Sequence, residues 1–156
     1  MQSKAKDAGE KLANSLLDRY LGSDSSSSGK NTFKQGETFQ FDDFELTVEK
    51  SYTKTKIDNM FSDNDGKTVI KVPVKVKNVS DETSHLSSFY ITYFGSKGTE
   101  IDDVEYYFDD SIDDSKDFRP GAEAEKYIYL LYDGSGTYAV EFEYFSETKT
   151  VEIEVK

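Results

Sequence analysis

Apolar and polar side chains alternate along most of the chain after residue 38, with the two-residue period of half-buried β-strands. In the clearest run, residues 70–77, every second side chain is isoleucine or valine and the positions between them are lysine or proline. Shorter runs of this kind lie at residues 39–41, 44–48, 89–93, 140–144 and 151–155. Residues 127–132 are apolar on both faces, which is typical of a central strand.

Two residues inside these runs carry specific expectations. Pro73 has no N–H to donate, so that side of its strand should face an edge or a bulge. Asn78 ends the long strand, where its side chain can hydrogen-bond nearby backbone groups in place of the ladder. Turn-forming residues separate the runs, among them Asp65-Gly66 and Pro120-Gly121. About seven strands with such turns predict an all-β fold, an antiparallel immunoglobulin-like β-sandwich over residues 34–156.

The first part of the chain follows a different pattern. Residues 1–22 place alanine and leucine three or four positions apart and end at Gly22, which predicts a short N-terminal amphipathic helix. Residues 23–33 are rich in serine and predict a flexible linker. An isolated helix of this length is marginal in water, so its apolar stripe should find a partner. Three interpretations stay open: a stalk, a homodimer through this helix, and a segment that folds onto the sandwich.

Four segments, in this order, resemble a known family. They are KQGETFQFDDFELTVEKSY (residues 34–52), VIKVPVKVKNVSDE (69–82), FYITYFGSKGTEI (89–101) and FRPGAEAEKYIYLLY (118–132). The order resembles a family of domains of unknown function that is common in lipoproteins of Gram-positive bacteria. That family shares the immunoglobulin-like fold of the mycobacterial immunoprotective extracellular antigen. The strongest pieces are Gly36-Glu37, Asn78 and Pro120-Gly121, which are fold markers and not reactive groups, so the resemblance implies architecture more than activity.

The resemblance also implies a place in the cell. Members of this family follow an export signal and a lipidated cysteine or a membrane helix, and then a serine-rich spacer. The spacer is present here and cysteine is not. We therefore expect an extracellular domain, anchored to the bacterial cell surface through a segment absent from this chain. Its expected partner is a protein or a cell-wall ligand.

Composition excludes several classes of function. With 19 basic and 31 acidic side chains among 156 residues, the formal net charge is −12, which argues against binding nucleic acid. The absence of cysteine excludes disulfides, thiolate metal sites and cysteine nucleophiles. One histidine excludes any site that needs two imidazoles. Hydrophobic residues are only 35% of the chain, but eleven Phe and eleven Tyr can fill a core.

Acidic residues are concentrated between residues 100 and 117. A solvated loop is the favoured interpretation, because runs of charge usually face solvent. The alternative is a loop that supplies hard oxygen ligands to Ca²⁺ as a cofactor. Its candidate metal ligands are Asp109, Asp110, Asp113 and Asp114, although their spacing does not match an EF-hand loop.

Tyr106, Tyr107 and Phe108 lie inside this acidic run. Three consecutive aromatic side chains flanked by acids are not expected all to be buried. Tyrosine and phenylalanine are enriched at protein interfaces, so we predict a contact patch at these three residues.

His85 has serines nearby in the sequence and could act as the base of a hydrolase. However, triad partners come from distant segments, and the chain has no Gly-x-Ser-x-Gly nucleophile motif. We therefore predict no catalytic residues. The sequence favours a non-enzymatic extracellular or cell-surface interaction domain. A calcium-binding or calcium-stabilised surface module and a hydrolase are the alternatives.

Overall fold

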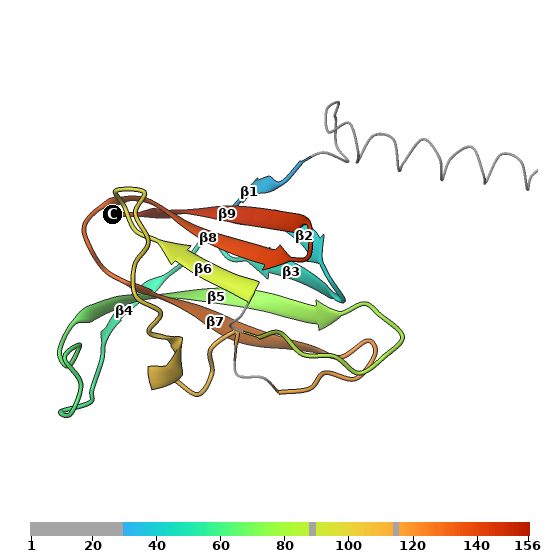
Figure 1. Cartoon of the computed structure of the whole chain (residues 1–156), viewed down its shortest axis with the longest axis horizontal. Coiled ribbons are helices and arrows are strands. Elements are labelled where there is room, and N and C mark those ends of the chain that lie inside the picture. The colour runs from blue at the N-terminus through green and yellow to red at the C-terminus, as the bar shows by residue number, and fades with distance from the viewer. Residues whose placement is uncertain (1–29, 88–89, 114–115) are drawn as a thin grey trace, which may run out of the picture. The chain divides into compact units, whose positions relative to one another are not determined.

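The computed structural model describes residues 30–87, 90–113 and 116–156. Residues Thr32–Lys156 form one compact unit, in which two β-sheets pack face to face (Figure 1). One sheet has the strand order β1-β9-β8-β6, and the other has β2-β3-β5-β4 with β7 also paired to β5. The strands are Thr32–Lys34 (β1), Thr38–Phe41 (β2), Phe44–Val48 (β3), Thr53–Lys56 (β4), Thr68–Asn78 (β5), Ile91–Phe94 (β6), Glu123–Leu131 (β7), Gly136–Tyr144 (β8) and Glu147–Val155 (β9).

A short helical turn also lies in the described part of the chain. The 3-10 turn η3 covers Glu105–Tyr107, in the long connection between β6 and β7. Among the described residues, no helix is both long enough and apolar enough to cross a membrane.

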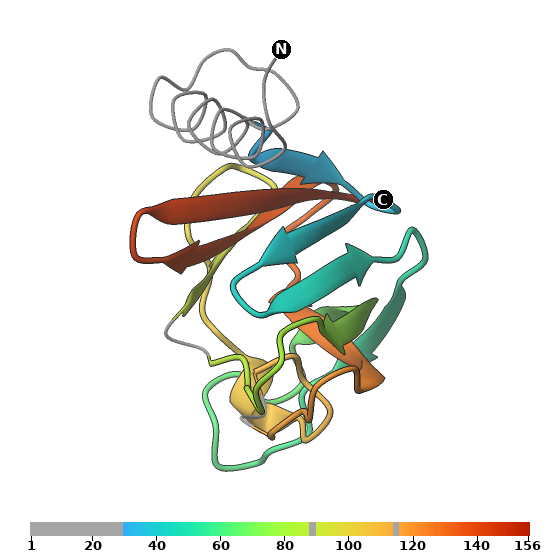
Figure 2. The same cartoon turned by 90° about the vertical axis from the view of Figure 1, so that its right-hand side faces the viewer.

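The main core lies between the two sheets, where the alternation of the sequence places one apolar face of each sheet (Figure 2). Val74 of the five-stranded sheet and Val140 and Phe142 of the four-stranded sheet are fully buried. The Phe142 ring centroid lies 5.9 Å from that of Phe39 and 5.6 Å from that of Phe41, so aromatic rings join the two sheets. Burying one such side chain stabilises the fold by about 1.5–3 kcal/mol.

β5 is the central strand of the five-stranded sheet. It pairs with β7 along one edge, and β3 and β4 share the other edge end to end. Pro73 lies opposite residues 49–52, where β3 has ended and β4 has not begun. Its carbonyl accepts a hydrogen bond from the Glu49 N–H at 2.9 Å, so the nitrogen that lacks a proton faces this break as well. The expectation that Pro73 faces an edge or a bulge is confirmed.

Asn78 ends β5 and is fully buried. Its Nδ2 donates to the carbonyls of Glu82 and Phe118, both at 2.8 Å. Its Oδ1 accepts from the backbone N–H of Ser80 at 2.9 Å and from the Ser80 hydroxyl at 2.7 Å. The side chain thus ties the loop that leaves β5 to the segment that enters β7, and the predicted backbone role of Asn78 is confirmed.

Tyr138 closes the corner where the chain crosses from β7 in one sheet to β8 in the other. Its hydroxyl donates to the Gly134 carbonyl at 2.7 Å and accepts from the Asp133 N–H at 2.8 Å. A tyrosine near the start of a strand whose hydroxyl bonds back to the backbone upstream is the tyrosine corner of immunoglobulin-like sandwiches. Local hydrogen bonding therefore agrees with the architecture expected from the strand pattern.

The all-β class is confirmed, and every predicted strand has a counterpart in the structure. Two short strands were not predicted. β4 reads Thr-Lys-Thr-Lys and has no apolar alternation, and β1 begins within the segment 23–33 expected to be a linker. β1 pairs with β9 in parallel, which departs from the expected antiparallel pattern. The helix predicted for residues 1–22 lies outside the described residues.

Candidate functional site

Residues 100–113, here called the acidic segment, cover one end of the outer face of the five-stranded sheet. Figure 1 shows η3 on the side of this sheet that faces away from the four-stranded sheet. The Ile112 N–H donates to the Tyr127 carbonyl at 2.8 Å, and the Tyr127 N–H donates to the Asp110 carbonyl at 3.1 Å. Beneath the segment lies a second apolar cluster, formed by Ile57, Val69, Val104 and Tyr129.

The acidic segment also explains why residues 127–132 are apolar on both faces. We predicted a central strand there, but β7 pairs with a strand only along the β5 edge. Along its other edge run single bridges from Asp103 to Leu130 and from Ser111 to Tyr127. The outward-facing Tyr129 is buried because the acidic segment covers it. The prediction of a central strand was wrong, since a covering loop produces the same sequence pattern.

Glu105, in η3, is an acidic side chain with no exposed surface. Its Oε1 accepts a hydrogen bond from the Tyr129 N–H at 3.1 Å and so provides a partner for this backbone donor at the edge of β7. Its Oε2 is buried without a hydrogen-bond partner, and so is the Tyr93 hydroxyl. Burial foremost, and then the negative charge of Asp113, raise the pKa of Glu105 well above its usual value. The protonated, neutral form of Glu105 is therefore favoured in the fold.

Tyr93 and Tyr129 line this buried carboxyl from two different sheets. Burial first, and the charge of Glu105 next, raise the pKa of the Tyr93 hydroxyl. A protonated Glu105 Oε2 has a proton to donate to the Tyr93 oxygen, which would satisfy both groups. The Tyr129 hydroxyl donates to Asp110 Oδ1, and burial raises the pKa of that hydroxyl. Tyr93 and Tyr129 are therefore held un-ionised and act as hydrogen-bonding groups.

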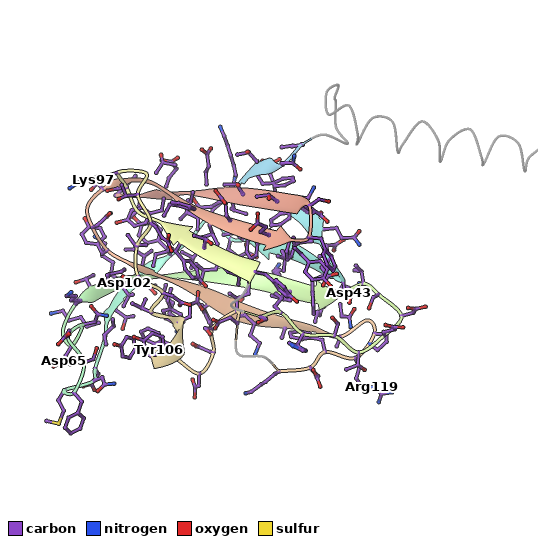
Figure 3. All side chains as sticks on the ribbon, in the orientation of Figure 1. Asp43, Asp65, Lys97, Asp102, Tyr106 and Arg119 are labelled. Atoms are coloured by element: carbon purple, nitrogen blue, oxygen red, sulfur yellow. The ribbon has the colours of Figure 1, made fainter. Side chains whose placement is uncertain are left out.

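The predicted contact residues divide into one exposed side chain and two that support it. Tyr106 is 70% exposed (Figure 3). Its hydroxyl donates to the Tyr107 hydroxyl at 3.1 Å, and the half-buried Tyr107 in turn hydrogen-bonds the Ser62 hydroxyl. Phe108 is half-buried and stacks on Tyr129, with ring centroids 3.8 Å apart and planes 3° apart. Tyr106 is therefore the exposed member of a group of aromatic side chains and contacts that group through Tyr107.

Two further exposed apolar residues escaped the sequence analysis. Met60 is 78% exposed and Phe61 is 92% exposed, in the loop of residues 57–67 between β4 and β5. This loop contacts η3 through the bond between Ser62 and Tyr107. From the sequence of this loop we predicted only a turn, at the turn-forming pair Asp65-Gly66. The available signal was a methionine and a phenylalanine placed side by side among turn-forming polar residues, where neither is needed for a turn.

The three described calcium candidates, Asp109, Asp110 and Asp113, do not gather into one metal-binding group. Asp110 forms an ion pair with Lys71 at 3.5 Å, while Asp109 is exposed. Asp113 accepts a hydrogen bond from the Ser111 hydroxyl at 2.6 Å. Asp114 lies outside the described residues. Across the described parts of the chain, no three His, Asp or Glu side chains are arranged to hold a metal ion. Calcium binding stays a prediction.

His85 lies on the surface and not in a cleft. Its Nδ1 is 3.3 Å from Asp117 Oδ1, and both side chains are at least half exposed. A shallow pocket of about 270 Å³ opens elsewhere, at the break between β3 and β4, where Lys71, Pro73 and Tyr127 are among its lining residues. The Lys71 Nζ lies 4.2 Å from the Tyr127 ring centroid, so the pocket's cation is already engaged.

A family model described as "Domain of unknown function (DUF4352)" matches residues 33–150. No curated protein matches the chain by sequence.

Solved structures share the fold at low sequence identity. MPT63, a secreted protein from Mycobacterium tuberculosis, is 15% identical with a TM-score of 0.58, and the match covers 80% of this chain and 97% of MPT63. The yjhA protein from Bacillus subtilis is 11% identical with a TM-score of 0.57, over 78% of this chain and 99% of yjhA. A Bacillus subtilis "putative lipoprotein (ycdA)" is 18% identical with a TM-score of 0.57, over 78% of this chain. The match spans only 39% of the ycdA protein.

Proposed function

Because this chain belongs to the DUF4352 family of domains of unknown function, we propose that it is a non-enzymatic interaction domain of the bacterial cell exterior. The match confirms the resemblance inferred from the sequence. The domain binds a partner protein through the loops at the η3 end of its five-stranded sheet, and an upstream segment anchors it to the cell surface.

The proposed location is supported by what is stated of two proteins that share this fold. MPT63 is a secreted protein, and the ycdA protein carries a lipoprotein assignment. Both share this sandwich at low identity, so they supply a precedent for the fold outside the cytoplasm and not a shared activity. The serine-rich residues 23–33 fit a spacer between an anchor and the sandwich.

One observation carries the binding role: the exposed Tyr106 ring lies against the half-buried Tyr107 ring, with centroids 4.3 Å apart. Below it, η3 is fixed to β7 by the buried Glu105, and Phe108 is stacked on Tyr129. A large amphipathic ring that is held rigidly and left in water provides contact area at a low cost in conformational entropy. Interfaces concentrate their binding energy in such residues.

The same geometry supports a non-enzymatic role. His85 pairs with an exposed carboxylate at the surface, and the buried carboxyl of Glu105 is covered on all sides. General acid–base chemistry needs a titratable group within reach of a bound substrate. Glu105 has no solvent access and His85 has no enclosing pocket, so neither offers such a site.

Site-specific photo-crosslinking in the producing bacterium tests the proposal. A benzophenone amino acid replaces Tyr106 in the full-length protein, and in a matched variant it replaces Phe145, which is 87% exposed in the β8–β9 turn. We expect one discrete adduct from position 106, removed when intact cells are first treated with external protease. Equal adducts from both positions, or an adduct that survives the protease, would contradict the proposal.

A further inference from the structure

Two loops that are far apart in the sequence expose large apolar side chains at the same end of the sandwich. Met60 and Phe61 come from the loop between β4 and β5, and Tyr106 comes from η3. The loops are joined through Tyr107, whose hydroxyl bonds the Ser62 hydroxyl on one side and the Tyr106 hydroxyl on the other. Most of the large apolar side chains exposed in the described parts of the chain thus gather at this end. We call Met60, Phe61 and Tyr106 the Phe61 surface.

The loop that carries Phe61 is held in shape by its own hydrogen bonds. The Asp65 carboxylate accepts from the Asn59 N–H at 2.9 Å, and the Gly66 N–H donates to the Ile57 carbonyl at 2.8 Å. Ile57 itself is buried in the second apolar cluster. Because the loop backbone is already fixed, a partner that binds Phe61 need not order the loop, which reduces the entropy lost on binding.

Carboxylates surround the Phe61 surface. Exposed aspartates lie in both loops, at Asp58, Asp63, Asp65, Asp102, Asp103 and Asp109. Figure 3 shows Asp65, Asp102 and Tyr106 at the same end of the sandwich. None of these six aspartates belongs to an ion pair within the parts of the chain that the structure describes.

This charge decides which partner the surface accepts. Two lysines lie near six aspartates: Lys56 directly precedes the loop, and Lys67 lies in it with its Nζ bonded to Asn64 at 3.0 Å. The local field is therefore strongly negative, as is the whole chain at a net charge of −12. Phosphate-rich wall polymers and anionic lipid surfaces are repelled, whereas lysine and arginine side chains are attracted.

From the apolar centre and the acidic rim, we propose that the Phe61 surface binds a basic segment of a partner protein, one that carries lysine or arginine beside an apolar side chain. The apolar side chain packs on Met60 and Phe61. The cation lies over the exposed face of the Tyr106 ring and pairs with the aspartates around it. This assignment of the partner class rests on the proposed function.

Selection of short random peptides displayed on phage tests the partner class. The wild-type full chain is expected to enrich peptides with lysine or arginine next to an aromatic or aliphatic residue. Peptides chosen from that pool should bind more weakly as salt rises, because exposed charges are screened. The double variant Phe61→Ser/Tyr106→Ser should weaken binding at least about tenfold, since truncation of central apolar contacts typically removes more than about 1.4 kcal/mol.

Charge variants separate the rim from the apolar centre. Asp63→Asn/Asp102→Asn should weaken binding about 2- to 30-fold, because two exposed ion pairs with the partner are lost. Asp81→Asn/Glu143→Gln removes the same charge from exposed positions elsewhere and should leave binding unchanged.

The outcomes distinguish this inference from the function on which it rests. Enrichment of neutral or acidic peptides that still depends on Phe61 and Tyr106 overturns the basic partner and leaves an interaction domain. Equal effects of the two charge variants overturn the role of the acidic rim. Peptide enrichment that is unchanged in Phe61→Ser/Tyr106→Ser overturns both the partner class and the binding surface.

Discussion

The two apolar clusters of this domain differ in the side chains that form them. The main core between the sheets consists of aliphatic and aromatic side chains such as Val74 and Phe142. The second cluster, under the acidic segment, places the carboxyl of Glu105 and the hydroxyl of Tyr129 beside apolar groups. The main core includes only two tyrosine hydroxyls, those of Tyr93 and Tyr138, among its described buried residues, whereas the second cluster is held by hydrogen bonds to carboxylates. We infer that the first cluster maintains the sandwich and that the second orients the loops used in binding.

The largest effect should come from truncating the main core. Phe142→Ala removes a fully buried ring that touches Phe39 and Phe41, and should lower the free energy of unfolding by about 3–5 kcal/mol. Denaturant unfolding followed by circular dichroism measures this loss. Phe145→Ala, at an exposed position, is the matched control and should change it by less than about 0.5 kcal/mol. Comparable losses in both variants would mean that the core is misassigned.

The second cluster should respond to pH in a way that the main core does not. The pKa of Glu105 is higher in the fold than in the unfolded chain, chiefly because of burial and the charge of Asp113. Glu105 therefore contributes its full stability below its unfolded pKa of about 4.3, and that contribution is lost as pH rises through the folded pKa. Over that window the free energy of unfolding falls by up to about 1.4 kcal/mol per pH unit.

Glu105→Gln isolates this effect, because an amide stays neutral at every pH. The amide can still accept from the Tyr129 N–H and can donate to the Tyr93 hydroxyl. We expect the two proteins to be about equally stable near pH 4 and the variant to be the more stable near pH 8. Parallel pH profiles for wild type and variant would show that the Glu105 pKa is not raised.

Strand pattern predicted the main core well because inward-facing apolar positions alternate with mostly polar outward-facing positions in most of the strands. The edge or bulge at Pro73 and the backbone hydrogen bonds of Asn78 were predicted from single residues, because proline has no N–H to donate and an asparagine side chain can bond backbone groups. The second cluster could not be foreseen in this way. Its covering loop is acidic in sequence, and only the fold shows that Glu105 turns inward while Tyr106 turns outward. Phe61 was missed because it lies in a turn, where hydrophobic and polar residues follow no regular period that would predict which side chains are exposed.

A smaller, local effect should follow from removing one hydroxyl of the second cluster. Tyr129→Phe loses the hydrogen bond to Asp110 but keeps the ring stacked on Phe108, and should cost about 1–2 kcal/mol. Hydrogen exchange read by mass spectrometry should show faster exchange in residues 103–112 and unchanged exchange in β8 and β9. Faster exchange throughout both sheets would instead mean that the two clusters unfold as one unit.

The smallest effect on stability belongs to the side chains with the largest expected effect on binding. Phe61→Ser/Tyr106→Ser should change the free energy of unfolding by less than about 0.5 kcal/mol, because both side chains lie mostly in water. Denaturant unfolding of the double variant, run beside Phe145→Ser, measures it. A loss well above that of the control would show that these residues support the acidic segment. A negligible loss together with weakened peptide binding would show that these two side chains serve binding and not folding. The fold would then give no reason for two aromatic rings to lie exposed among aspartates.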